Sequence, residues 1–263
     1  MALPIELTNL RAIVTGASSG IGAGIALALA RAGCDIACCG LDDPHSAGVQ
    51  QVIAQISAQR RQAFYKQADL ADSIAARAFV DWAAEQLGGV EIVASNAGRN
   101  VFRGVAATSD ADWQANIDLN LAAHWRVAQA AKPYLDQAAH PVVIVTTSNH
   151  AYRTMPGCFP YNVAKAGITA LVQSMAIEWG PHVRAVGIAP GFIDTPLADA
   201  WFGEFPDPAA KRAQVEAIHS AGRLGTPADI GALVAFLASP LAGFITGTTI
   251  LIDGGRSAVM QDV

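Results

Sequence analysis

The sequence predicts an α/β fold with a single domain built on one doubly wound parallel sheet. Three observations predict it. Short runs of apolar and β-branched residues alternate with helical stretches along the whole chain, which is typical of a parallel sheet covered by helices on both faces. A glycine-rich turn separates the first strand-like run from the first helical stretch. The 263 residues contain no linker, repeat or low-complexity segment, so we expect one domain over residues 1–263.

The composition excludes several classes of protein. Hydrophobic residues make up 52% of the chain and charged residues 15%, with a net charge of −5 and no basic run. We therefore expect a buried core and no nucleic-acid partner. No uninterrupted apolar stretch is long enough to cross a membrane, and the first residues lack the basic-then-apolar layout of a signal peptide. These features predict a cytoplasmic protein that has no membrane partner.

The cysteines and histidines give no sign of a disulfide framework or a metal site. Cys34, Cys38, Cys39 and Cys158 form no Cys-x-x-Cys pair, and the histidines lack the spacing of metal ligands. Cys38 and Cys39 stand in an apolar run and are expected to be buried as small hydrophobic residues. We therefore expect no metal.

The first strand, turn and helix are expected at residues 11–15, 16–22 and 23–32. Glycines in the turn let the backbone bend sharply and approach a ligand closely. The helix directs its first amides and its positive dipole end at the turn, which favours an anionic pyrophosphate. The spacing is Gly-x-x-x-Gly-x-Gly and not the common Gly-x-Gly-x-x-Gly. A tight turn without a ligand is the alternative interpretation.

The second strand, expected at 35–41, bears on the choice of cofactor. In dinucleotide-binding sheets, a carboxylate at the end of this strand bonds the ribose 2′-hydroxyl, whereas a nearby arginine accepts a 2′-phosphate. Here Gly40 occupies the expected acidic position and Asp42 follows two residues later. The choice between NAD and NADP therefore stays open. Asp42 and Asp43 would repel a 2′-phosphate, which favours NAD.

The remaining elements continue the alternation. Further strands are expected at 62–67, 90–95, 141–147, 182–188 and 248–252, and further helices at 45–59, 73–87, 161–179 and 227–238. Asp72 or Ser73 is expected to cap the helix at 73–87. Residues 110–137 predict a long helical region that Lys132-Pro133 interrupts. Residues 197–220 contain aromatic residues and prolines, and predict an irregular segment.

Tyr161 and Lys165 stand four residues apart, so they share one face of a helix. A tyrosine with an ordinary pKa of about 10 is a poor base at neutral pH. A neighbouring ammonium favours the phenolate and lowers the pKa of the tyrosine. The pair therefore predicts a tyrosine that serves as an acid/base catalyst. A chance pair on a solvated helix is the alternative.

Several short motifs follow one another in a fixed order along the chain. They are Thr15-Gly16-Ala17-Ser18-Ser19-Gly20-Ile21-Gly22, Asp69-Leu70, Asn96-Ala97-Gly98, Asn120, Ser148, Tyr161 with Lys165, and Pro190-Gly191 with Thr195. Together they resemble the short-chain dehydrogenase/reductase family over nearly the whole chain. The resemblance implies a Rossmann-type fold. It also implies an NAD(P)-dependent enzyme that interconverts a secondary alcohol and its carbonyl by hydride transfer.

The resemblance implies a catalytic set of four residues. Tyr161 would be the general acid/base, and Ser148 would bond and orient the same substrate oxygen. Lys165 would lower the pKa of the tyrosine and bind the nicotinamide ribose. Asn120 would hold a water that links Lys165 to solvent. A non-catalytic dinucleotide sensor is the alternative, but a sensor has no need of this set.

The expected cofactor-binding residues are Gly16, Ser18, Ser19, Gly20, Ile21, Gly22, Asp42, Asp69, Leu70, Asn96, Ala97, Gly98, Tyr161, Lys165, Pro190, Gly191, Ile193 and Thr195. The resemblance implies that Asp69 accepts from the adenine amino group and that Asn96 and Gly98 line the adenosine side. Thr195 would contact the carboxamide or a phosphate. Ser95 departs from the family pattern, which has asparagine there, and a serine reaches less far.

The substrate is less well defined by the sequence. Polar side chains shortly after Ser148, combined with aromatic walls, would suit a sugar, a polyol or a small hydroxy-ketone; the residues are His150, Tyr152, Arg153, Trp201, Phe202 and Phe205. The segment at about 192–220 is expected to be a mobile lid. Alternatively, these aromatic residues only pack the lid onto the body.

The runner-up enzyme is a 3-oxoacyl carrier-protein reductase, for which Arg99, Arg103 and Arg153 would form a basic patch, although the acidic chain does not favour it. The resemblance also implies a homotetramer in which the helices at 110–137 and 161–179 pair across a two-fold axis.

Overall fold

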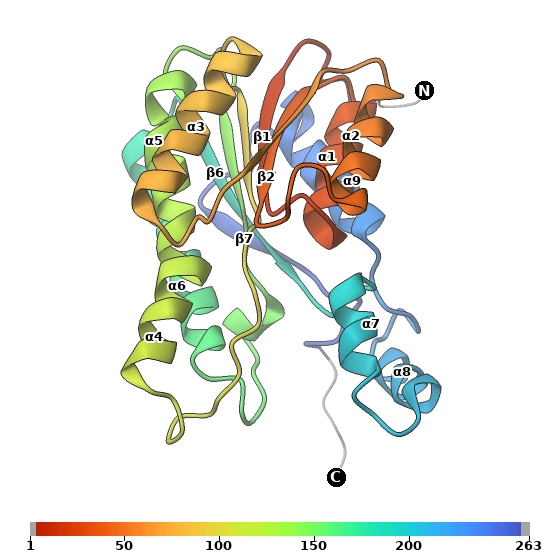
Figure 1. Cartoon of the computed structure of the whole chain (residues 1–263). Coiled ribbons are helices and arrows are strands. Elements are labelled where there is room, and N and C mark those ends of the chain that lie inside the picture. Colours follow the sequence, from red (N-terminus) through yellow and green to blue (C-terminus); the bar gives the residue numbers. More distant parts are fainter. Residues whose placement is uncertain (1–3, 259–263) are drawn as a thin grey trace.

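The computed structural model describes residues 4–258, in which seven parallel strands form one sheet in the order β3-β2-β1-β4-β5-β6-β7 (Figure 1). The strands are β1 (Arg11–Thr15), β2 (Asp35–Gly40), β3 (Ala63–Gln67), β4 (Ile92–Ser95), β5 (Val142–Thr146), β6 (Arg184–Pro190) and β7 (Thr248–Ile252). The α/β fold class and the doubly wound parallel sheet are confirmed.

Helices cover both faces of the sheet. They are α1 (Gly20–Arg31), α2 (Ala47–Ser57), α3 (Ser73–Leu87), α4 (Asp110–Ile117), α5 (Ala123–Leu135), α6 (Tyr161–Trp179), α7 (Pro196–Phe202), α8 (Pro208–Ala217) and α9 (Pro227–Ala238). Figure 1 shows α1, α2 and α9 on one face and α3 and α5 on the other. Side chains alternate along a strand, so Val14 of β1 packs into the core under α1 and α9, and Ile13 into the core under α3, α5 and α6.

The strand order reverses between β1 and β4, which lie side by side in the middle of the sheet. In one direction the chain builds β2 and β3, and in the other it builds β5, β6 and β7. The loops that leave the carboxyl ends of β1 and β4 therefore diverge to opposite faces. Open α/β sheets bind their ligands in the crevice that such a reversal leaves.

The long helical region is interrupted at a different place from the one predicted. It consists of α4, a π turn at Asp118–Ala122 and α5. Pro133 lies inside α5 and does not interrupt it. The proline sits in the last turn, and the helix ends two residues later at Leu135, so few helical hydrogen bonds depend on it. The π turn instead coincides with Asn120, which is fully buried.

The segment predicted to be irregular contains two short helices, α7 and α8. Each begins with a proline at its first position, where the missing amide proton costs nothing. Thr195 caps α7 by accepting a hydrogen bond from the backbone amide of Ala198 at 3.3 Å. Asp207 caps α8 in the same way by accepting from the amide of Ala210 at 2.9 Å. The prolines therefore start helices here, which corrects the expectation that they keep the segment irregular.

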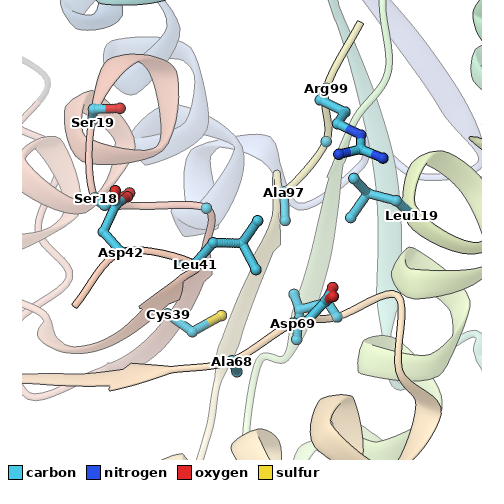
Figure 2. A pocket seen from close by; sticks show the side chains of 14 residues that line it. Ser18, Ser19, Cys39, Leu41, Asp42, Ala68, Asp69, Ala97, Arg99 and Leu119 are labelled. Atoms are coloured by element: carbon cyan, nitrogen blue, oxygen red, sulfur yellow. The ribbon is translucent and has the colours of Figure 1, made fainter. Parts of the chain in front are cut away.

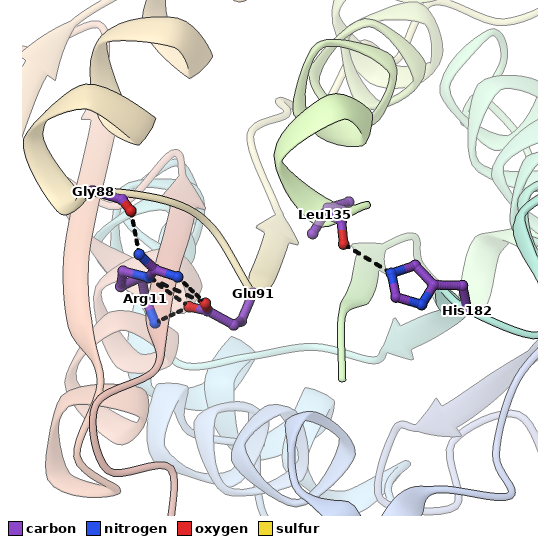
Figure 3. Close-up of polar contacts among 5 residues, drawn as sticks. All are labelled: Arg11, Gly88, Glu91, Leu135 and His182. Atoms are coloured by element: carbon purple, nitrogen blue, oxygen red, sulfur yellow. Dashed lines mark hydrogen bonds and ion pairs between the residues drawn. The ribbon is translucent and has the colours of Figure 1, made fainter. Parts of the chain in front are cut away.

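Charged groups close the amino edge of the sheet (Figure 3). Arg11 begins β1, and its Nε donates to both carboxylate oxygens of Glu91, at 3.1 and 2.9 Å. The backbone amide of Arg11 donates to the same carboxylate at 2.7 Å. Farther along this edge, a ring nitrogen of His182 lies 3.3 Å from the carbonyl oxygen of Leu135. These contacts fix where β1, β4 and β6 start relative to the helices.

The caps and the other features agree with a self-contained core. Asp72 caps α3, as predicted, by accepting from the amide of Ile74 at 2.8 Å. In residues 4–258 the four cysteines are buried and form no disulfide. This part of the chain also contains no helix with the length and apolar character needed to span a bilayer. Among the same residues, no group of three or more acidic, cysteine or histidine side chains gathers as a metal site.

Candidate active site

The glycine-rich turn that follows β1 is shaped by its glycines. Gly16 and Gly20 have φ values of +65° and +56°, which residues with a side chain rarely adopt. A Cβ on Gly22 would lie 2.1 Å from the carbonyl oxygen of Gly16, so only glycine fits there. Ser19 precedes α1, and within the described residues no side chain caps this helix. Its first amides are therefore available to an anionic ligand.

A cleft of about 220 Å³ opens beside this turn, and loops from the carboxyl ends of β1 to β4 line it. Its lining residues are Gly16, Ser18, Ser19, Cys39, Gly40, Leu41, Asp42, Ala68, Asp69, Leu70, Ala97, Gly98, Arg99 and Leu119. Figure 2 shows Ser18, Leu41 and Asp42 on one side of the cleft and Arg99 and Leu119 on the other. The structure thus brings together eight of the predicted cofactor-binding residues, which are Gly16, Ser18, Ser19, Asp42, Asp69, Leu70, Ala97 and Gly98. Gly40, which stands where an acidic side chain was expected, also lines the cleft.

Asn96 is placed differently from its expected position on the adenosine side. Its side-chain amide donates to the carbonyl oxygens of Thr15 and Gly16, at 3.2 and 3.4 Å. The hydroxyl of Thr15 in turn accepts from the amides of Asn96 and Ala97, at 2.8 and 3.0 Å. Asn96 therefore braces the glycine turn against the end of β4, and it is absent from the residues that line the cleft.

Ser95 finds a partner of its own on α5. Its hydroxyl lies 2.8 Å from Nδ1 of His124, and both side chains are buried. Burial and the charge of Lys165 hold the pKa of His124 well below its usual range, so the ring is neutral at pH 7. The shorter reach of a serine at this position is thus compensated by a histidine from the neighbouring helix.

The four predicted catalytic residues occupy neighbouring elements near the carboxyl edge. Ser148 follows β5, Tyr161 begins α6, Lys165 lies one turn later, and Asn120 lies in the π turn. The Ser148 hydroxyl accepts from the amide of His150 at 3.2 Å, which fixes the turn that carries it. Nζ of Lys165 lies 5.6 Å from the centre of the Tyr161 ring. All four side chains are buried.

The predicted lowering of the tyrosine pKa is absent in the ligand-free chain. Burial raises the pKa of Tyr161 to about 12, and the neighbouring Ser148 hydroxyl offsets only part of this rise. Burial also lowers the pKa of Lys165 to about 7, so much of its positive charge is lost at neutral pH. The expected effect of an ammonium on a phenol therefore meets a larger opposing effect, which is the loss of water around both groups.

Lys165 and Asn120 converge on Gly98. Nζ of Lys165 donates to the carbonyl oxygen of Thr146 at 3.2 Å. The Asn120 side chain accepts from the amide of Arg99 and donates to its carbonyl oxygen, both at 3.0 Å. A Cβ on Gly98 would lie 2.8 Å from Oδ1 of Asn120 and 3.4 Å from Nζ of Lys165. The backbone after β4 therefore passes directly over the two side chains.

Six other predicted cofactor residues do not line the cleft in this structure. They are Gly20, Ile21, Gly22, Pro190, Gly191 and Ile193. Ile193 is buried and bridges to Gly225, and Gly191 packs so closely on Asp253 that a Cβ would lie 2.7 Å from the aspartate Cβ. Thr195 also lies outside the lining. Its hydroxyl caps α7, and its methyl group would lie 3.3 Å from a Cβ on Gly20.

Sequence reasoning missed several residues near the site. Cys39, Leu41, Ala68 and Arg99 line the cleft, and each stands next to a strand end or motif that was recognised, so strand position was the available signal. Leu119 also lines it, but only because the π turn directs it there.

Two aromatic rings flank the tyrosine. Phe102 meets the Tyr161 ring edge-on with centres 5.4 Å apart, and His150 does so at 6.0 Å. Burial first, and then the charge of Arg256, lower the pKa of His150. The loop that carries Phe102 offered no sequence signal for this contact.

The similarity to known proteins covers nearly the whole chain. A family model described as enoyl-(acyl carrier protein) reductase matches residues 16–257. The short-chain dehydrogenase/reductase eriH of Hericium erinaceus is 36% identical over 249 residues, which are 93% of this chain and 96% of that protein. The chain belongs to the short-chain dehydrogenase/reductase family. The L-rhamnose 1-dehydrogenase (NAD(P)(+)) of Sphingomonas sp. strain SKA58 is 33% identical over 257 residues, 95% of this chain and 96% of that one.

A solved short-chain dehydrogenase/reductase fold supports the same conclusion. The crystal structure of carveol dehydrogenase from Mycobacterium avium in complex with NAD superposes with a TM-score of 0.90 at 26% identity, covering 97% of this chain and 99% of that one. As a member of the family, the protein is an NAD(P)-dependent oxidoreductase that interconverts a secondary alcohol and its carbonyl. The uncapped first turn of α1 fits a pyrophosphate, and the lack of a side chain at Gly98 lets the backbone that lines the cleft lie against Asn120 and Lys165.

Proposed function

We propose that Tyr161 is the general acid/base of this dehydrogenase and that Ser148 holds the substrate oxygen beside it. The observation that carries the proposal is the convergence next to the cleft of Tyr161 and Lys165 from α6, Ser148 from the end of β5 and Asn120 from the π turn. The nicotinamide of the bound cofactor supplies or accepts the hydride. The chain's own residues position the substrate oxygen and move its proton.

The contacts support a route for the proton. In alcohol oxidation, the phenolate form of Tyr161 would take the hydroxyl proton, and the Ser148 hydroxyl would donate to the oxygen on which charge develops. Burial raises the pKa of Tyr161, so the positive charges of Lys165 and of the bound oxidised cofactor would have to favour this phenolate. Lys165 stands behind the tyrosine, with its ammonium near the Thr146 carbonyl oxygen. Lys165 would bind the nicotinamide ribose, and Asn120 would hold the water that connects Lys165 to solvent. The buried, partly deprotonated lysine suits a group that passes protons at neutral pH.

The substrate class that we propose is a sugar, a polyol or a small hydroxy-ketone. His150, kept neutral by its burial, can exchange hydrogen bonds with hydroxyl groups, and Phe102 supplies an apolar wall next to Tyr161. A relative that is 33% identical is named as an L-rhamnose 1-dehydrogenase, which supports a sugar. Oxidation of a panel of sugars, polyols and simple secondary alcohols, followed by the nicotinamide absorbance, tests this class.

We further propose that NAD binds more tightly than NADP. Asp42 lines the cleft, and the arginine that shares the lining, Arg99, lies on the opposite side (Figure 2). A 2′-phosphate near Asp42 would therefore meet a negative charge without a compensating cation beside it. A solved relative was crystallised with NAD, which is compatible with this preference.

The runner-up is a 3-oxoacyl carrier-protein reductase, and the description of the matching family model supports an acyl carrier partner. The arginines of the candidate basic patch do not favour it. Arg103 is paired with Asp112 at 3.2 Å, and Arg153 donates to the neighbouring carbonyl oxygen of Tyr152. A comparison of a 3-oxoacyl thioester with a free hydroxy-ketone as substrates separates the two functions.

The decisive variant is Tyr161→Phe. We expect turnover to fall by about 10²–10⁴-fold, because the proton-transfer group is lost while the ring remains. NADH binding and the unfolding midpoint should stay close to those of the unmodified enzyme. Tyr152→Phe is a matched control, since Tyr152 is exposed and its backbone, not its hydroxyl, makes the recorded hydrogen bonds. Near-normal turnover of Tyr161→Phe would refute the mechanism. If the unmodified protein turned over no substrate of the panel, the non-catalytic sensor would be favoured instead.

We also propose a homotetramer formed through α4, α5 and α6. Trp125 of α5 and Ile177 of α6 are 45% and 80% exposed, and burial against a second copy would cover them. Light scattering that shows a monomer at micromolar concentration would contradict this. A cytoplasmic location stays a prediction, for which fractionation of cells is the test.

The segment at about 192–220 is proposed as a substrate lid. Its helices share a small core of their own, in which Phe202 is buried, and the ring of Trp201 packs at a tilt against that of Phe192, with centres 5.3 Å apart. Arg212 of α8 pairs with Asp194 and Asp199, at 2.9 and 2.7 Å, so the two helices would move as one body. Hydrogen exchange tests this: α7 and α8 should become protected when NADH and a substrate analogue bind.

A further inference from the structure

A side chain on β3 fills the place beside Gly40 where a side chain at the end of β2 would project. Tyr65 pairs with Cys38 across the two strands, so its ring faces the same side of the sheet as Gly40. A Cβ on Gly40 would lie 2.9 Å from the Tyr65 hydroxyl oxygen and 3.0 Å from that of Ser18. The next nearest atom is Cβ of Ser18, at 3.4 Å. Tyr65, together with Ser18, therefore crowds the place that a side chain at position 40 would occupy.

The same hydroxyl holds the loop that carries Asp42. Oη of Tyr65 donates to the carbonyl oxygen of Asp42 at 3.0 Å, and Nε2 of Gln67 donates to that of Leu41 at 2.7 Å. Two side chains of β3 thus fix consecutive carbonyl groups just past the end of β2. Burial, together with the charge of Asp42, raises the pKa of Tyr65, so the hydroxyl keeps its proton and remains a donor.

The two aspartates of this loop are directed differently. The carboxylate of Asp43 accepts from the amide of His45 at 2.7 Å, within its own loop, and Asp43 does not line the cleft. Asp42 lines the cleft, and among residues 4–258 its carboxylate has no recorded hydrogen bond or ion pair. Asp42 is therefore the carboxylate available to the adenosine ribose, and its position depends on the backbone that Tyr65 holds.

We propose that Tyr65 is a positioning residue for cofactor choice: it excludes a carboxylate from position 40 and holds Asp42 at the cleft in its place. The inference rests on the proposed preference for NAD over NADP. Tyr65 is absent from the residues that line the cleft, so it acts through Asp42 and not by touching the cofactor. In this arrangement the carboxylate of Asp42 discriminates against a 2′-phosphate. A hydrogen bond from Tyr65 of β3 holds the backbone of Asp42 in place.

The test is a double-mutant cycle on binding of NADH and NADPH to the full-length enzyme, followed by the fluorescence of the reduced cofactors. The measured quantity is the ratio of the Kd for NADPH to the Kd for NADH. In Tyr65→Phe we expect this ratio to fall by about fivefold, the factor that one net hydrogen bond supplies. Asp42→Asn should also lower the ratio, and adding Tyr65→Phe to Asp42→Asn should lower it no further.

Tyr134→Phe is the matched control, because Tyr134 also donates its hydroxyl to an aspartate, Asp81, at 3.0 Å, on α5 and away from the cleft. Its ratio should equal that of the unmodified enzyme. A ratio below one in the unmodified enzyme would refute the NAD preference and this inference with it. A ratio above one that Tyr65→Phe leaves unchanged would overturn the inference alone.

A second pair of variants tests the exclusion of a side chain at position 40. Gly40→Ala should lower the unfolding midpoint in the unmodified background, because the new methyl group meets the Tyr65 hydroxyl. With Tyr65→Phe in the same chain, Gly40→Ala should lower the midpoint by less, since the conflicting oxygen is gone. Equal losses in the two backgrounds would show that Tyr65 does not occupy this place.

Discussion

At the amino edge of the sheet charged side chains form ion pairs with one another, whereas charged side chains at the carboxyl edge line a cleft. Arg11 pairs with Glu91, and the carboxylate of Asp35 pairs with Arg61 at 2.9 Å. Asp42 and Arg99, at the other edge, have no recorded side-chain partner within residues 4–258. Both edges need polar groups where strands end, and among these residues it is Asp42 and Arg99, at the carboxyl edge, that lack a side-chain partner within the described chain. The difference separates side chains that support the fold from side chains that can recognise a ligand.

The two edges also differ in backbone. The turn after β1 contains Gly16 and Gly20 at positive φ, and the first amides of α1 lack a side-chain cap within the described chain. At the start of β1, by contrast, the backbone amide of Arg11 is already occupied by a carboxylate. Unpaired amides are costly unless a ligand or water takes them. The stability of the amino edge permits the carboxyl edge to keep its donors open.

The largest effect is expected from a methyl group in the glycine turn. Gly22→Ala places a Cβ 2.1 Å from the Gly16 carbonyl oxygen, so the turn must open. We expect NADH binding to weaken by about 100-fold, which corresponds to about 3 kcal/mol of overpacking. Titration of the reduced cofactor measures it. Gly203→Ala is the control, because its nearest contact would be at 3.3 Å and its φ of −62° is ordinary. Unchanged NADH binding in Gly22→Ala would remove the turn from the cofactor site.

A smaller effect, on stability and not on turnover, is expected at the amino edge. Glu91→Gln removes the charge that pairs with Arg11 and that accepts its backbone amide. We expect the free energy of unfolding to fall by about 2 kcal/mol, with kcat and KM unchanged. Urea unfolding and steady-state kinetics measure the two quantities. Asp136→Asn, which breaks the exposed pair with Lys132, should cost less than about 0.5 kcal/mol. A loss of activity in Glu91→Gln without a loss of stability would contradict the division between the edges.

The smallest effect is a pH dependence caused by Lys165 at the carboxyl edge. The pKa of Lys165 is lowered to about 7 in the folded chain, so above pH 7 the unfolded chain binds more protons at this residue. Relative to that of Lys165→Met, the free energy of unfolding of the cofactor-free enzyme should therefore rise by about 1 kcal/mol between pH 7 and 8.

The buried cysteines oppose this rise in both proteins. Burial raises the pKa of all four thiols, so above about pH 8.5 the folded chain binds more protons at these residues and the free energy of unfolding falls. Urea unfolding of the enzyme and of Lys165→Met at pH 7 and 8 measures the difference. The same change with pH in both proteins would mean that Lys165 does not contribute.

Strand ends and motifs could be located from the sequence because local chemistry determines them. The glycine turn, the expected cleft residues after β1 to β4 and Ser148, one of the four proposed catalytic residues, stand next to short apolar runs that are recognisable by themselves. Pro196 and Pro208 each follow a capping residue, which is typical of a helix start, although the aromatic and proline content of residues 197–220 favours an irregular segment. A capping residue followed directly by a proline predicts the start of a helix at both places.

The burial of a side chain in the folded protein cannot be predicted from the sequence in the same way. The spacing of Tyr161 and Lys165 predicts their proximity, but not that both lie in a site dry enough to raise one pKa and lower the other. The contact of Ser95 with His124 joins residues 29 positions apart, and neither residue signals the other. The role of Asn96 as a brace depends on the path of the neighbouring strand, which is also a property of the fold.

The π turn at Asp118–Ala122 changes the rotational setting of α5 relative to α4 in the helical region behind the site. An α-helix advances by about 100° per residue, and the turn holds one residue more than an α-helical turn would. The direction in which the buried residues of α5 point, from His124 to Leu135, is therefore not tied to the direction of Asn120 by a regular α-helix. Deleting a single residue from the turn would leave two intact helices and rotate one against the other. Leu119 would then leave the cleft wall, so the length of this turn, as much as its composition, is a constraint on the site.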